Sequence, residues 1–589
     1  MRLHDHSVSF CPFKQEIRTY RWSFLQGDLM AALAVALLTI PQSIAYSLLA
    51  GLPPTAGLFS AIFGTIFTSI FGSSRHLISG PSTGIAILIQ TAISDVLFDY
   101  FPAVAGPERD ALVLHILGQI VLVMGVVQIG AAFFNVSKLL QFVSRTVMLG
   151  YFAGIMTAVI INQLFYFFGV HPTGSEVIVV LKGAQFLMHL GQTHWLTVAI
   201  GAASLLLLML LKRSRRALPD ALIVLIAASA LNWGLGVWLQ HPAAPTLREF
   251  GLSAQPFPEL AWPILDFKMI NRIFPSAIAI AFLAILEVFS ISRNFAARCG
   301  QRVQANQDIF GLGVGNMVLS FLIGAMPASG SATRTALNFR FQAQTRFAAI
   351  FSGIFTAGII IFCWPLIQLI PLPALAALLL ATMPMLVNFK EVRLALRATR
   401  EDRWVFFLTF AACLIFTLDV AFFIGIVISI GTYLRRSAIP HLVEYAFNSK
   451  GRLVVVSPKE DVHRKVRIIG IGGDLYFASA DVFQEALQEI AEDPSVAAIV
   501  LRLTNVYHMD ASMCLAIQRL HETLESTHRH LVISGLTEEV WHVFHRTGLV
   551  KRIGLDNLYF TDESNPQFST WKACLRAQEL IHKSAKYSM

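Results

Sequence analysis

The feature that most constrains this chain is a succession of apolar segments long enough to cross a lipid bilayer. The run LMAALAVALLTIPQSIAYSLLA at 29–50 contains no charged residue, and VAIGAASLLLLMLLK at 198–212 meets its first charge at its end. Hydrophobic residues make up 55% of the 589 positions and charged residues 14%, whereas a soluble protein carries about a quarter charged residues. About 20 consecutive apolar residues span the hydrocarbon core of a bilayer. The sequence therefore predicts an α-helical membrane protein that crosses the bilayer many times.

Segment length, together with the Pro, Gly and charged residues between segments, divides the apolar region into about fourteen predicted spans. Some exceed the thickness of the hydrocarbon core and others fall short of it. An even number of spans returns the chain to the side on which it started. The predicted spans are 27–49, 53–71, 82–97, 111–134, 146–168, 194–212, 218–239, 272–292, 306–325, 332–343, 346–370, 372–388, 404–418 and 420–436.

Basic residues gather at the ends of these spans. KRSRR at 212–216 is one cluster, and others lie at 293–302, 390–403 and 435–436, whereas the loop at 240–270 carries few basic residues. With a cytoplasmic N-terminus, all four clusters are cytoplasmic, as the positive-inside rule requires. The net charge of +9 is thereby accounted for by membrane topology, and no nucleic-acid partner is expected.

Other compositional signals exclude some classes of protein. The six cysteines are scattered without a CxxC pair, so we interpret them as packing residues and expect neither a metal site nor a disulfide framework. The first apolar segment follows a charged leader and runs on without a cleavage signal, which argues against a signal peptide. The apolar spans contain no nucleophile motif or Cys/His pair, so the sequence predicts no enzyme and no cofactor.

Two stretches of small polar residues interrupt the apolar pattern, SGPSTG at 79–84 and PASGSATRT at 327–335. Each precedes a predicted span that is short or polar at its start, 82–97 or 332–343. The offset of 250 residues (332 minus 82) also carries the first span onto the eighth. Seven spans in each half give the halves opposite orientations. Short, interrupted segments at matching places in inverted repeats predict a transport site.

A helix that starts inside the membrane presents unpaired N–H groups and the positive end of its dipole. Two such starts facing each other form an anion site. Gly80 and Gly330 allow close backbone approach. An arginine at bilayer depth, Arg334, costs at least about 2.5–3.5 kcal/mol on insertion scales, which favours a functional role over snorkelling or a structural ion pair. The side chains predicted to contact the anion are Ser82, Thr83, Thr333 and Arg334, with helix capping as the alternative for each hydroxyl taken singly.

Glu287, in AFLAILEVFSISR, is the second ionisable group within an apolar span. It can pair with Arg334, bind a cation, or take up a proton when the anion enters; the alternative is a structural hydrogen bond to a neighbouring helix. Gln42 and Tyr46 lie one turn apart after Pro41 and face the same side of the first span. They are therefore candidate residues of the cavity wall.

After residue 437 the composition becomes that of a soluble protein. KVRIIGIG, VAAIVLRL and HLVISGL read as buried strands, and SADVFQEALQEIAE and ASMCLAIQRLHETLE read as amphipathic helices between them. The predicted domains are a cytoplasmic N-terminal segment at 1–26, a transmembrane domain at 27–437 and a cytoplasmic α/β domain at 438–589.

The stretch GDLMAALAVALLTIPQSIAYSLLAGLPPTAGLFSAIFG at 27–64 resembles the first-span signature of the SulP (sulfate permease) anion transporters. The resemblance continues through SGPSTG, LEVFSISR and SGSATRTALN, and the C-terminal region is similar to a STAS domain. It implies a fold of seven-plus-seven inverted spans divided into core and gate domains, a homodimer, and transport of sulfate, bicarbonate, chloride or dicarboxylates. The resemblance also implies an anion-site role for Gln42, Tyr46, Ser82, Thr83, Thr333 and Arg334, and places Glu287 at the family's acidic position.

Two positions depart from the family pattern. Sodium-coupled bicarbonate members are expected to carry a second carboxylate one turn after the glutamate, where this chain has Ile291. In YHMDASM, the position after Asp510 that is phosphorylated in anti-sigma-factor antagonists is Ala511. We therefore expect proton coupling ahead of sodium coupling, and helix capping by Asp510 and Ser512 in place of a phosphoswitch.

The sequence thus predicts a secondary active transporter of a small anion of the sulfate, bicarbonate or dicarboxylate class. Proton symport is expected, with anion exchange or a channel-like, anion-sensing protein as alternatives and sodium-dependent bicarbonate symport behind them. The expected partners are the anion, a proton, the bilayer and a second copy of the chain. The expected location is a plasma membrane, as in the inner membrane of a bacterium, with the N-terminus and the STAS domain in the cytoplasm.

Overall fold

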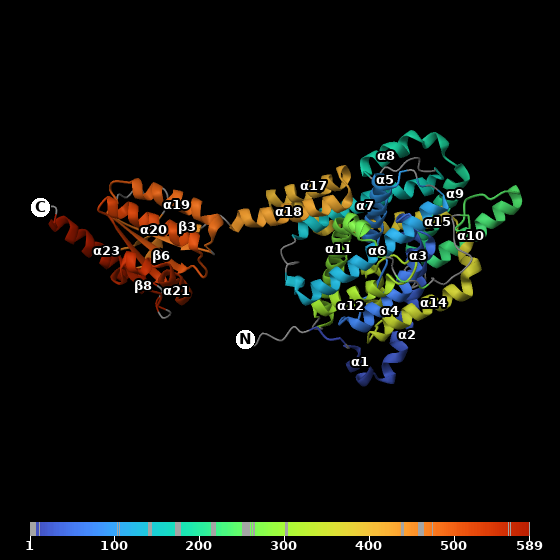
Figure 1. Ribbon diagram of the computed structural model, residues 1–589, viewed down its shortest axis with the longest axis horizontal. Coiled ribbons are helices and arrows are strands. Elements are labelled where there is room, and N and C mark those ends of the chain that lie inside the picture. Colours follow the sequence, from blue (N-terminus) through green and yellow to red (C-terminus); the bar gives the residue numbers. More distant parts are fainter. Residues whose placement is uncertain are drawn as a thin grey trace. The chain divides into compact units, whose positions relative to one another are not determined.

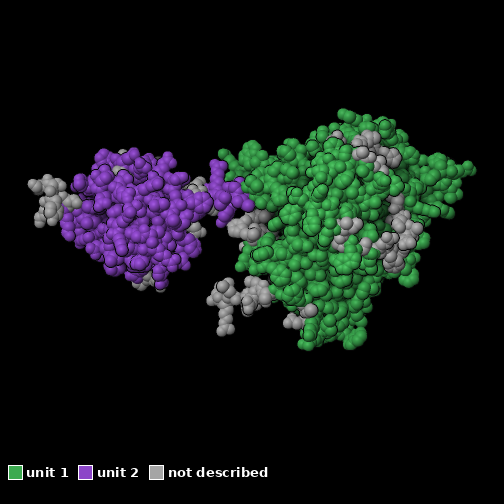
Figure 2. Space-filling model, viewed as in Figure 1, with its two compact units in different colours: residues 1–429 green, residues 430–589 purple. Residues whose placement is uncertain are grey.

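The computed structural model describes most of the chain. The residues that it describes form two compact units, 1–429 and 430–589, each with its own core (Figure 2). The described residues are 8–10, 12–102, 104, 106–138, 144–170, 178–213, 220–249, 260, 262, 265–300, 304–437, 441–456, 464–473, 475–562, 565 and 567–587.

The first unit is helical, and ten of its described helices are long and apolar enough to cross a membrane. All fourteen predicted spans coincide with helical segments (Figure 1). The segments are α2 (Trp22–Leu49), α3 (Pro54–Phe59) continued by η1 (Ser60–Gly64) and α4 (Thr65–Phe71), α5 (Thr83–Tyr100), α6 (Pro107–Phe133), α7 (Arg145–Phe168), α9 (Trp195–Arg213), α10 (Asp220–Leu239), α11 (Phe267–Cys299), α12 (Ala305–Leu319), α13 (Ala332–Arg340), α14 (Phe347–Gln368), α15 (Leu372–Thr382), α17 (Arg400–Ile415) and α18 (Leu418–Ser437).

The helices of the first unit pack as two bundles. The core bundle comprises α2–α6 with α11–α14, where α12 packs on α6 and α4, and α14 packs on α2. The gate bundle comprises α7, α9 and α10 with α15, α17 and α18, where α17 packs on α7 and α15 on α9. The bundles meet along α5 and α7 and where α2 contacts α10 and α15. Each bundle therefore takes helices from both halves of the sequence, as the predicted inverted repeat requires.

Some elements were not predicted from the apolar pattern. The second span contains one π-helical turn, η1, and two additional helices occur, α8 (Val179–Met188) and α16 (Phe389–Ala398). Both additional helices have ten residues and are too short to cross a bilayer. The remaining short elements of this unit are α1 (Phe13–Thr19), η3 (Leu190–Gln192), η4 (Met383–Met385), β1 (Ser79–Gly80) and β2 (Ser329–Gly330).

Close helix contact in the core bundle depends on glycine. A Cβ added to Gly313 of α12 would lie 2.8 Å from the Ile129 nitrogen of α6, and one added to Gly125 would lie 2.9 Å from the Met317 nitrogen. Small residues let helix backbones approach each other in membranes, where packing replaces the hydrophobic effect. These glycines therefore hold α12, which leads to β2, firmly against α6.

The second unit is a six-stranded sheet in the order β4-β3-β5-β6-β7-β8, in which β5 to β8 are parallel and β3 is antiparallel to both of its neighbours. Helices α19 to α22 cover one face and α23 covers the other. The three predicted strands are β5, β6 and β7, and the two predicted helices are α19 and α20. The elements are β3 (His441–Phe447), β4 (Leu453–Val455), β5 (Val466–Gly472), α19 (Phe477–Glu492), β6 (Ala498–Asn505), α20 (Ala511–Ser526), β7 (His530–Leu536), α21 (Glu538–Thr547), α22 (Leu549–Ile553), η5 (Leu555–Asn557), β8 (Leu558–Phe560) and α23 (Phe568–Tyr587).

Asp510 connects two helices of the second unit. Its carboxylate accepts hydrogen bonds from the Met513 nitrogen at 3.1 Å and the Phe477 nitrogen at 2.6 Å, so it caps α20 and also holds the start of α19. The predicted capping role of Asp510 is therefore confirmed. Ser512 lies inside α20, and the structure shows no capping bond from it within the described part of the chain.

We expect Asp510→Ala to lower the free energy of unfolding of the second unit by about 1–2 kcal/mol, because two backbone N–H groups lose their acceptor. Urea unfolding of a 438–589 fragment, followed by circular dichroism, measures this loss. Glu485→Ala on the exposed side of α19 is the control and should change stability by less than about 0.5 kcal/mol. Equal effects of the two substitutions would show that the cap contributes nothing.

Candidate functional site

Two short strands bring the starts of α5 and α13 together. In β1 and β2, Ser79 pairs with Gly330 and Gly80 with Ser329 in antiparallel register. The Ser331 nitrogen extends this pairing with a hydrogen bond to the Ile78 carbonyl at 2.9 Å. Because each strand ends two or three residues before its helix begins, the N-termini of α5 and α13 lie close together in the interior of the unit.

The side chain of Arg334 is fully buried beside this strand pair. Its Nη2 donates to the Pro81 carbonyl at 2.6 Å, so the side chain reaches from α13 to the strand that leads into α5. Within the described residues, Nε and Nη1 have no hydrogen-bond partner. Buried guanidinium donors are nearly always satisfied, and two that are not point to a ligand with acceptor oxygens.

Gly80 makes room for this arginine. A Cβ on Gly80 would lie 2.7 Å from Arg334 Nη1, and its φ of +148° is one that side-chain-bearing residues rarely adopt. Gly330 lies against α11, where an added Cβ would stand 3.1 Å from Ile291 Cδ1 and 3.2 Å from the Val288 nitrogen. Both glycines thus permit the close approach that the sequence predicted.

Glu287 of α11 connects the two halves of the site through hydroxyl groups. Its Oε2 accepts from Ser82 at 2.9 Å and from Ser329 at 2.5 Å, and 8% of the residue is exposed. Ser82 belongs to the start of α5, whereas Ser329 belongs to β2. Among the described residues, Glu287 and Arg334 form no ion pair with each other, so the opposite charges are held near one another by separate neutral partners.

The two candidates from the first span, Gln42 and Tyr46, are both buried on α2. Tyr46 is buried and its side chain interacts with those of Thr83 and Arg334. Gln42, one turn earlier on α2, is also buried, and its Oε1 lacks a partner within the described residues. Ser82 additionally accepts a long hydrogen bond, 3.5 Å, from the Ile85 nitrogen. Five of the seven predicted residues, Tyr46, Ser82, Thr83, Glu287 and Arg334, are therefore linked by contact or electrostatic interaction. Gln42 is buried on the same helix as Tyr46.

The seventh residue, Thr333, lies at the accessible edge of the site. It is half-buried, its hydroxyl is 3.4 Å from that of Ser331, and the preceding Ala332 is exposed. The first turn of α13 therefore has an exposed and a half-buried residue beside the fully buried Arg334.

Sequence reasoning missed three groups that shape the site. Ser329 holds the Glu287 carboxylate, the Pro81 carbonyl holds Arg334, and the Thr335 hydroxyl accepts from the Ile78 nitrogen at 3.1 Å. Ser329 carried a detectable signal, because the pair Ser-Gly occurs at 79–80 and again at 329–330. The contacts of Pro81 and Thr335 depend on the pairing of the strands, which no local pattern specifies.

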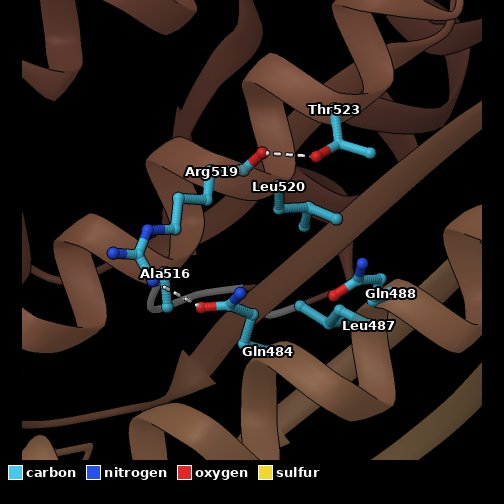
Figure 3. A pocket seen from close by; sticks show the side chains of 7 residues that line it. All are labelled: Gln484, Leu487, Gln488, Ala516, Arg519, Leu520 and Thr523. Carbon is cyan, nitrogen blue, oxygen red and sulfur yellow. Dashed lines mark hydrogen bonds between the residues drawn. The ribbon is translucent and has the colours of Figure 1, made fainter.

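The second unit has a small cavity between α19 and α20. Figure 3 shows Arg519 of α20 reaching across it to the Gln484 side chain of α19, a hydrogen bond of 3.2 Å. The cavity measures about 20 Å³, which accommodates about one water molecule. The wider hollow beside it, about 510 Å³, is lined by four acidic residues, Asp481, Glu485, Glu489 and Glu492. The first hollow is too small for an anion, and carboxylates outnumber the one arginine, Arg519, in the lining of the second.

The chain matches two family models in succession. The model described as the sulfate permease family matches residues 25–409, and the model described as the STAS domain matches residues 457–564. Among curated proteins, it is 26% identical over 577 residues to sulfate transporter 4.1, chloroplastic, of Arabidopsis thaliana, covering 94% of this chain and 82% of that one. It is 24% identical over 553 residues to a putative sulfate transporter of Bacillus subtilis, with 93% and 98% covered.

Solved structures share the fold. Murine Slc26a9, an anion transporter in the inward-facing state, superposes with a TM-score of 0.85 at 18% identity, covering 98% of this chain and 96% of that one. The transmembrane domain of the cyanobacterial bicarbonate transporter BicA superposes with a TM-score of 0.56 at 19% identity, covering 70% and 99%. The first match extends over both the helical unit and the sheet-containing unit. This multi-pass membrane protein with a C-terminal STAS domain belongs to the sulfate permease family of anion transporters.

Proposed function

We propose that the protein is a secondary active transporter whose anion binds between the N-termini of α5 and α13. The observation that carries the proposal is Arg334, fully buried with two guanidinium donors that have no partner within the described residues. Helix N-termini attract anions through their free N–H groups and dipoles. The anion's oxygens would occupy the free donors, with Ser82, Thr83 and Thr333 offering hydroxyls and Gln42 and Tyr46 closing the wall.

We propose that Glu287 couples a proton to this anion. Its carboxylate touches hydroxyls from both halves of the site, so it is close enough for a bound anion to act on it. An anion screens Arg334 and adds negative charge, and both effects favour protonation of Glu287. By linkage, a proton on Glu287 then strengthens anion binding by the same factor, which is the requirement for symport.

The same arrangement supports anion exchange if Glu287 keeps one protonation state throughout the cycle, and a channel-like role if transport needs no coupling. Sodium coupling has less support. Ile291, one turn after Glu287, lies next to Gly330 at the strand pair, so an apolar side chain occupies the place where a second carboxylate would help to hold the cation. Among the possible mechanisms, we therefore propose proton symport, with anion exchange or a channel-like role as alternatives. Sodium-dependent bicarbonate symport has the least support.

The proposed substrate is a small oxyanion of the sulfate, bicarbonate or dicarboxylate class. Relatives named sulfate transporters favour sulfate, and the fold shared with a bicarbonate transporter keeps bicarbonate as an alternative. We propose that the protein acts as a homodimer in a plasma membrane, as in a bacterial inner membrane. The positive-inside pattern supports a cytoplasmic location for the N-terminus and the STAS domain.

Arg334→Ala should weaken anion binding about ten- to a hundredfold, because charge-assisted hydrogen bonds contribute about 1.5–3 kcal/mol. Arg334→Lys should be intermediate, since it keeps the charge but loses the planar fork. Titration calorimetry with sulfate, bicarbonate and succinate on the purified protein measures the loss.

Arg340→Ala is the matched control, because Arg340 lies on the same helix in its last turn and is exposed. It should bind anions as the unsubstituted protein does. Size-exclusion chromatography checks that each variant is folded. Wild-type affinity in a folded Arg334→Ala protein would place the anion site elsewhere.

Glu287→Gln should mimic the protonated carboxyl group, since glutamine keeps the shape and can still accept from Ser82 and Ser329. We expect anion exchange between proteoliposomes and medium to survive, while uphill uptake driven by a pH gradient disappears. Asp308→Asn is the control, because Asp308 is a buried carboxylate on α12 bonded to Ser292 and to the loop before β1; it should retain the pH-driven uptake. Uptake driven by a sodium gradient at equal pH would show that sodium, and not a proton, is coupled to the anion.

Deletion of residues 445–589 should leave an anion-binding membrane unit, because the proposed site lies wholly within the first unit. Expression or transport rate can fall, but the equilibrium dissociation constant for the anion should stay within about twofold of the full-length value, a difference below about 0.5 kcal/mol. Binding is measured on the detergent-purified truncated protein. Loss of binding in a folded truncated protein would assign part of the site to the STAS domain.

A further inference from the structure

A lysine lies between the core and gate bundles, away from the candidate site. Lys182 belongs to α8, which packs on α7 of the gate bundle. Its Nζ donates to Asn162 Oδ1 of α7 at 3.0 Å and to Gln90 Oε1 of α5 at 3.5 Å. Because α5 belongs to the core bundle, the ammonium group joins the two bundles.

The charge of Lys182 is not neutralised by a carboxylate. Both of its partners are neutral amide oxygens, and the structure shows no ion pair of Lys182 with any described residue. Lys182 is half-buried, and a positive charge in largely apolar surroundings is costly without a counter-ion. A mobile anion is a suitable counter-ion here, because the other residues that line the cavity beside Lys182 are apolar or carry a neutral amide or hydroxyl group.

Lys182 also contacts α5, the helix whose N-terminus belongs to the candidate site. Gln90 follows Thr83, the first residue of α5, by seven positions (90 minus 83), which corresponds to about 10 Å along a helix at 1.5 Å per residue. A cavity of about 10 Å³ at this level is lined by residues of α5, α7 and α8, among them Gln90, Asn162 and Lys182. This volume holds about one water molecule, so a sulfate-sized anion can enter only after the bundles move apart.

Such a movement would break the bond between Lys182 and Gln90, because the two residues belong to different bundles. The ammonium group would then keep its hydrogen bond to Asn162, which belongs to the same bundle. The N–H donor that had bound Gln90 would point into the space between the bundles. Lys182 would also stand between the membrane face at the far end of α5 and the helix N-termini. An anion that enters from that face would meet this charge first.

Resting on the proposed anion transport, we propose that Lys182 forms a second anion-binding site, which takes small oxyanions on their way to the central site. In the present conformation the amide oxygens of Gln90 and Asn162 accept the hydrogen bonds of the ammonium group that the anion would otherwise accept. Lys182 therefore contributes to capture of the anion, whereas Arg334 contributes to its final binding.

The charge of the anion determines how strongly the ammonium group of Lys182 should attract it. A point charge attracts an anion in proportion to the anion's own charge. If removal of the ammonium raises the KM of a monovalent anion about threefold, the KM of a divalent anion should therefore rise about ninefold, the square of the first factor. High salt should shrink both effects because ions screen the attraction.

The experiment uses the full chain in proteoliposomes. Uptake of sulfate, bicarbonate and succinate by the unsubstituted protein is measured first, and the anion with the highest uptake serves as the probe. A competing anion of different charge is then added, which is nitrate for a divalent probe and sulfate for a monovalent probe. Lys182→Gln keeps a hydrogen-bond donor without the charge, and Lys182→Arg keeps the charge. Lys212→Gln on α9, which removes a charge from the same bundle at its exposed end, is the matched control.

A charge-rescue measurement supports the comparison. Lys182→Cys is treated during transport with 2-aminoethyl methanethiosulfonate, which restores an ammonium group, or with methyl methanethiosulfonate, which leaves the side chain neutral. Unsubstituted protein treated in the same way reports on the native cysteines. We expect KM to rise in the Gln and neutral Cys forms and to return toward the wild-type value in the Arg and aminoethyl forms, with little change in kcat.

Unchanged KM in folded Lys182→Gln, or equal fold-changes for monovalent and divalent anions, would overturn the proposal. A lower kcat with unchanged KM would also overturn it, since that result assigns Lys182 to a hydrogen bond between the bundles. Absence of uptake of all three anions by the unsubstituted protein would overturn the proposed function, and this inference with it. If the unsubstituted protein takes up an anion but the Lys182 substitutions leave its KM unchanged, only the proposed second site would be overturned.

Discussion

The candidate site depends on extended backbone that is buried inside a helical unit. Backbone N–H and C=O groups that leave a helix within a membrane protein find no water and must be satisfied by other protein groups. Here β1 and β2 satisfy each other, the Thr65 hydroxyl donates to the Ser79 carbonyl, and the Ala328 nitrogen donates to Asn316 Oδ1 at 2.7 Å. With these bonds made, α5 and α13 can both begin in the interior of the unit, beside the strand pair.

The two opposite charges at the strand pair are kept available for a ligand. Arg334 donates to a backbone carbonyl and Glu287 accepts from two serines. A direct ion pair between them would neutralise both groups and would be costly to break in a buried setting. Neutral partners hold each side chain in place and leave its charge uncancelled. Under the proposed function, a bound anion and a bound proton would therefore each alter the other's free energy of binding.

The sequence predicted the parts of this arrangement that leave a local pattern. Apolar length located fourteen helical segments, ten of which are long and apolar enough to cross a membrane. The repeated small-residue stretches located the two helix starts, and Arg334 and Glu287 stood out as ionisable groups in apolar surroundings. The partners of these groups were not predictable in the same way. Ser329, the Pro81 carbonyl and the Thr335 hydroxyl acquire their roles from the pairing of two strands, 79–80 and 329–330, that are far apart in the sequence and that only the folded chain brings together.

Lys182 was missed for a different reason. It lies in a helix of ten residues, too short to register as a span, and its sequence neighbours give no hint of Asn162 or Gln90. The two bundles each combine helices from both halves of the chain, so the boundary between them is a property of tertiary packing. Residues at that boundary are therefore the ones for which the sequence alone is least informative.

The charges at the site also constrain what can move together. In the empty site, Arg334 and an ionised Glu287 carry one positive and one negative charge, which sum to zero. Under the proposed coupling, a monovalent anion with a proton on Glu287 again sums to zero, because the anion replaces the carboxylate as the negative partner of Arg334. A divalent anion with one proton leaves one negative charge. Since moving net charge through a membrane costs about 2.3 kcal/mol per charge for each 100 mV, a symporter of this design moves a monovalent anion independently of membrane potential. Transport of a divalent anion into a negative interior, in contrast, needs a second proton or a larger pH gradient.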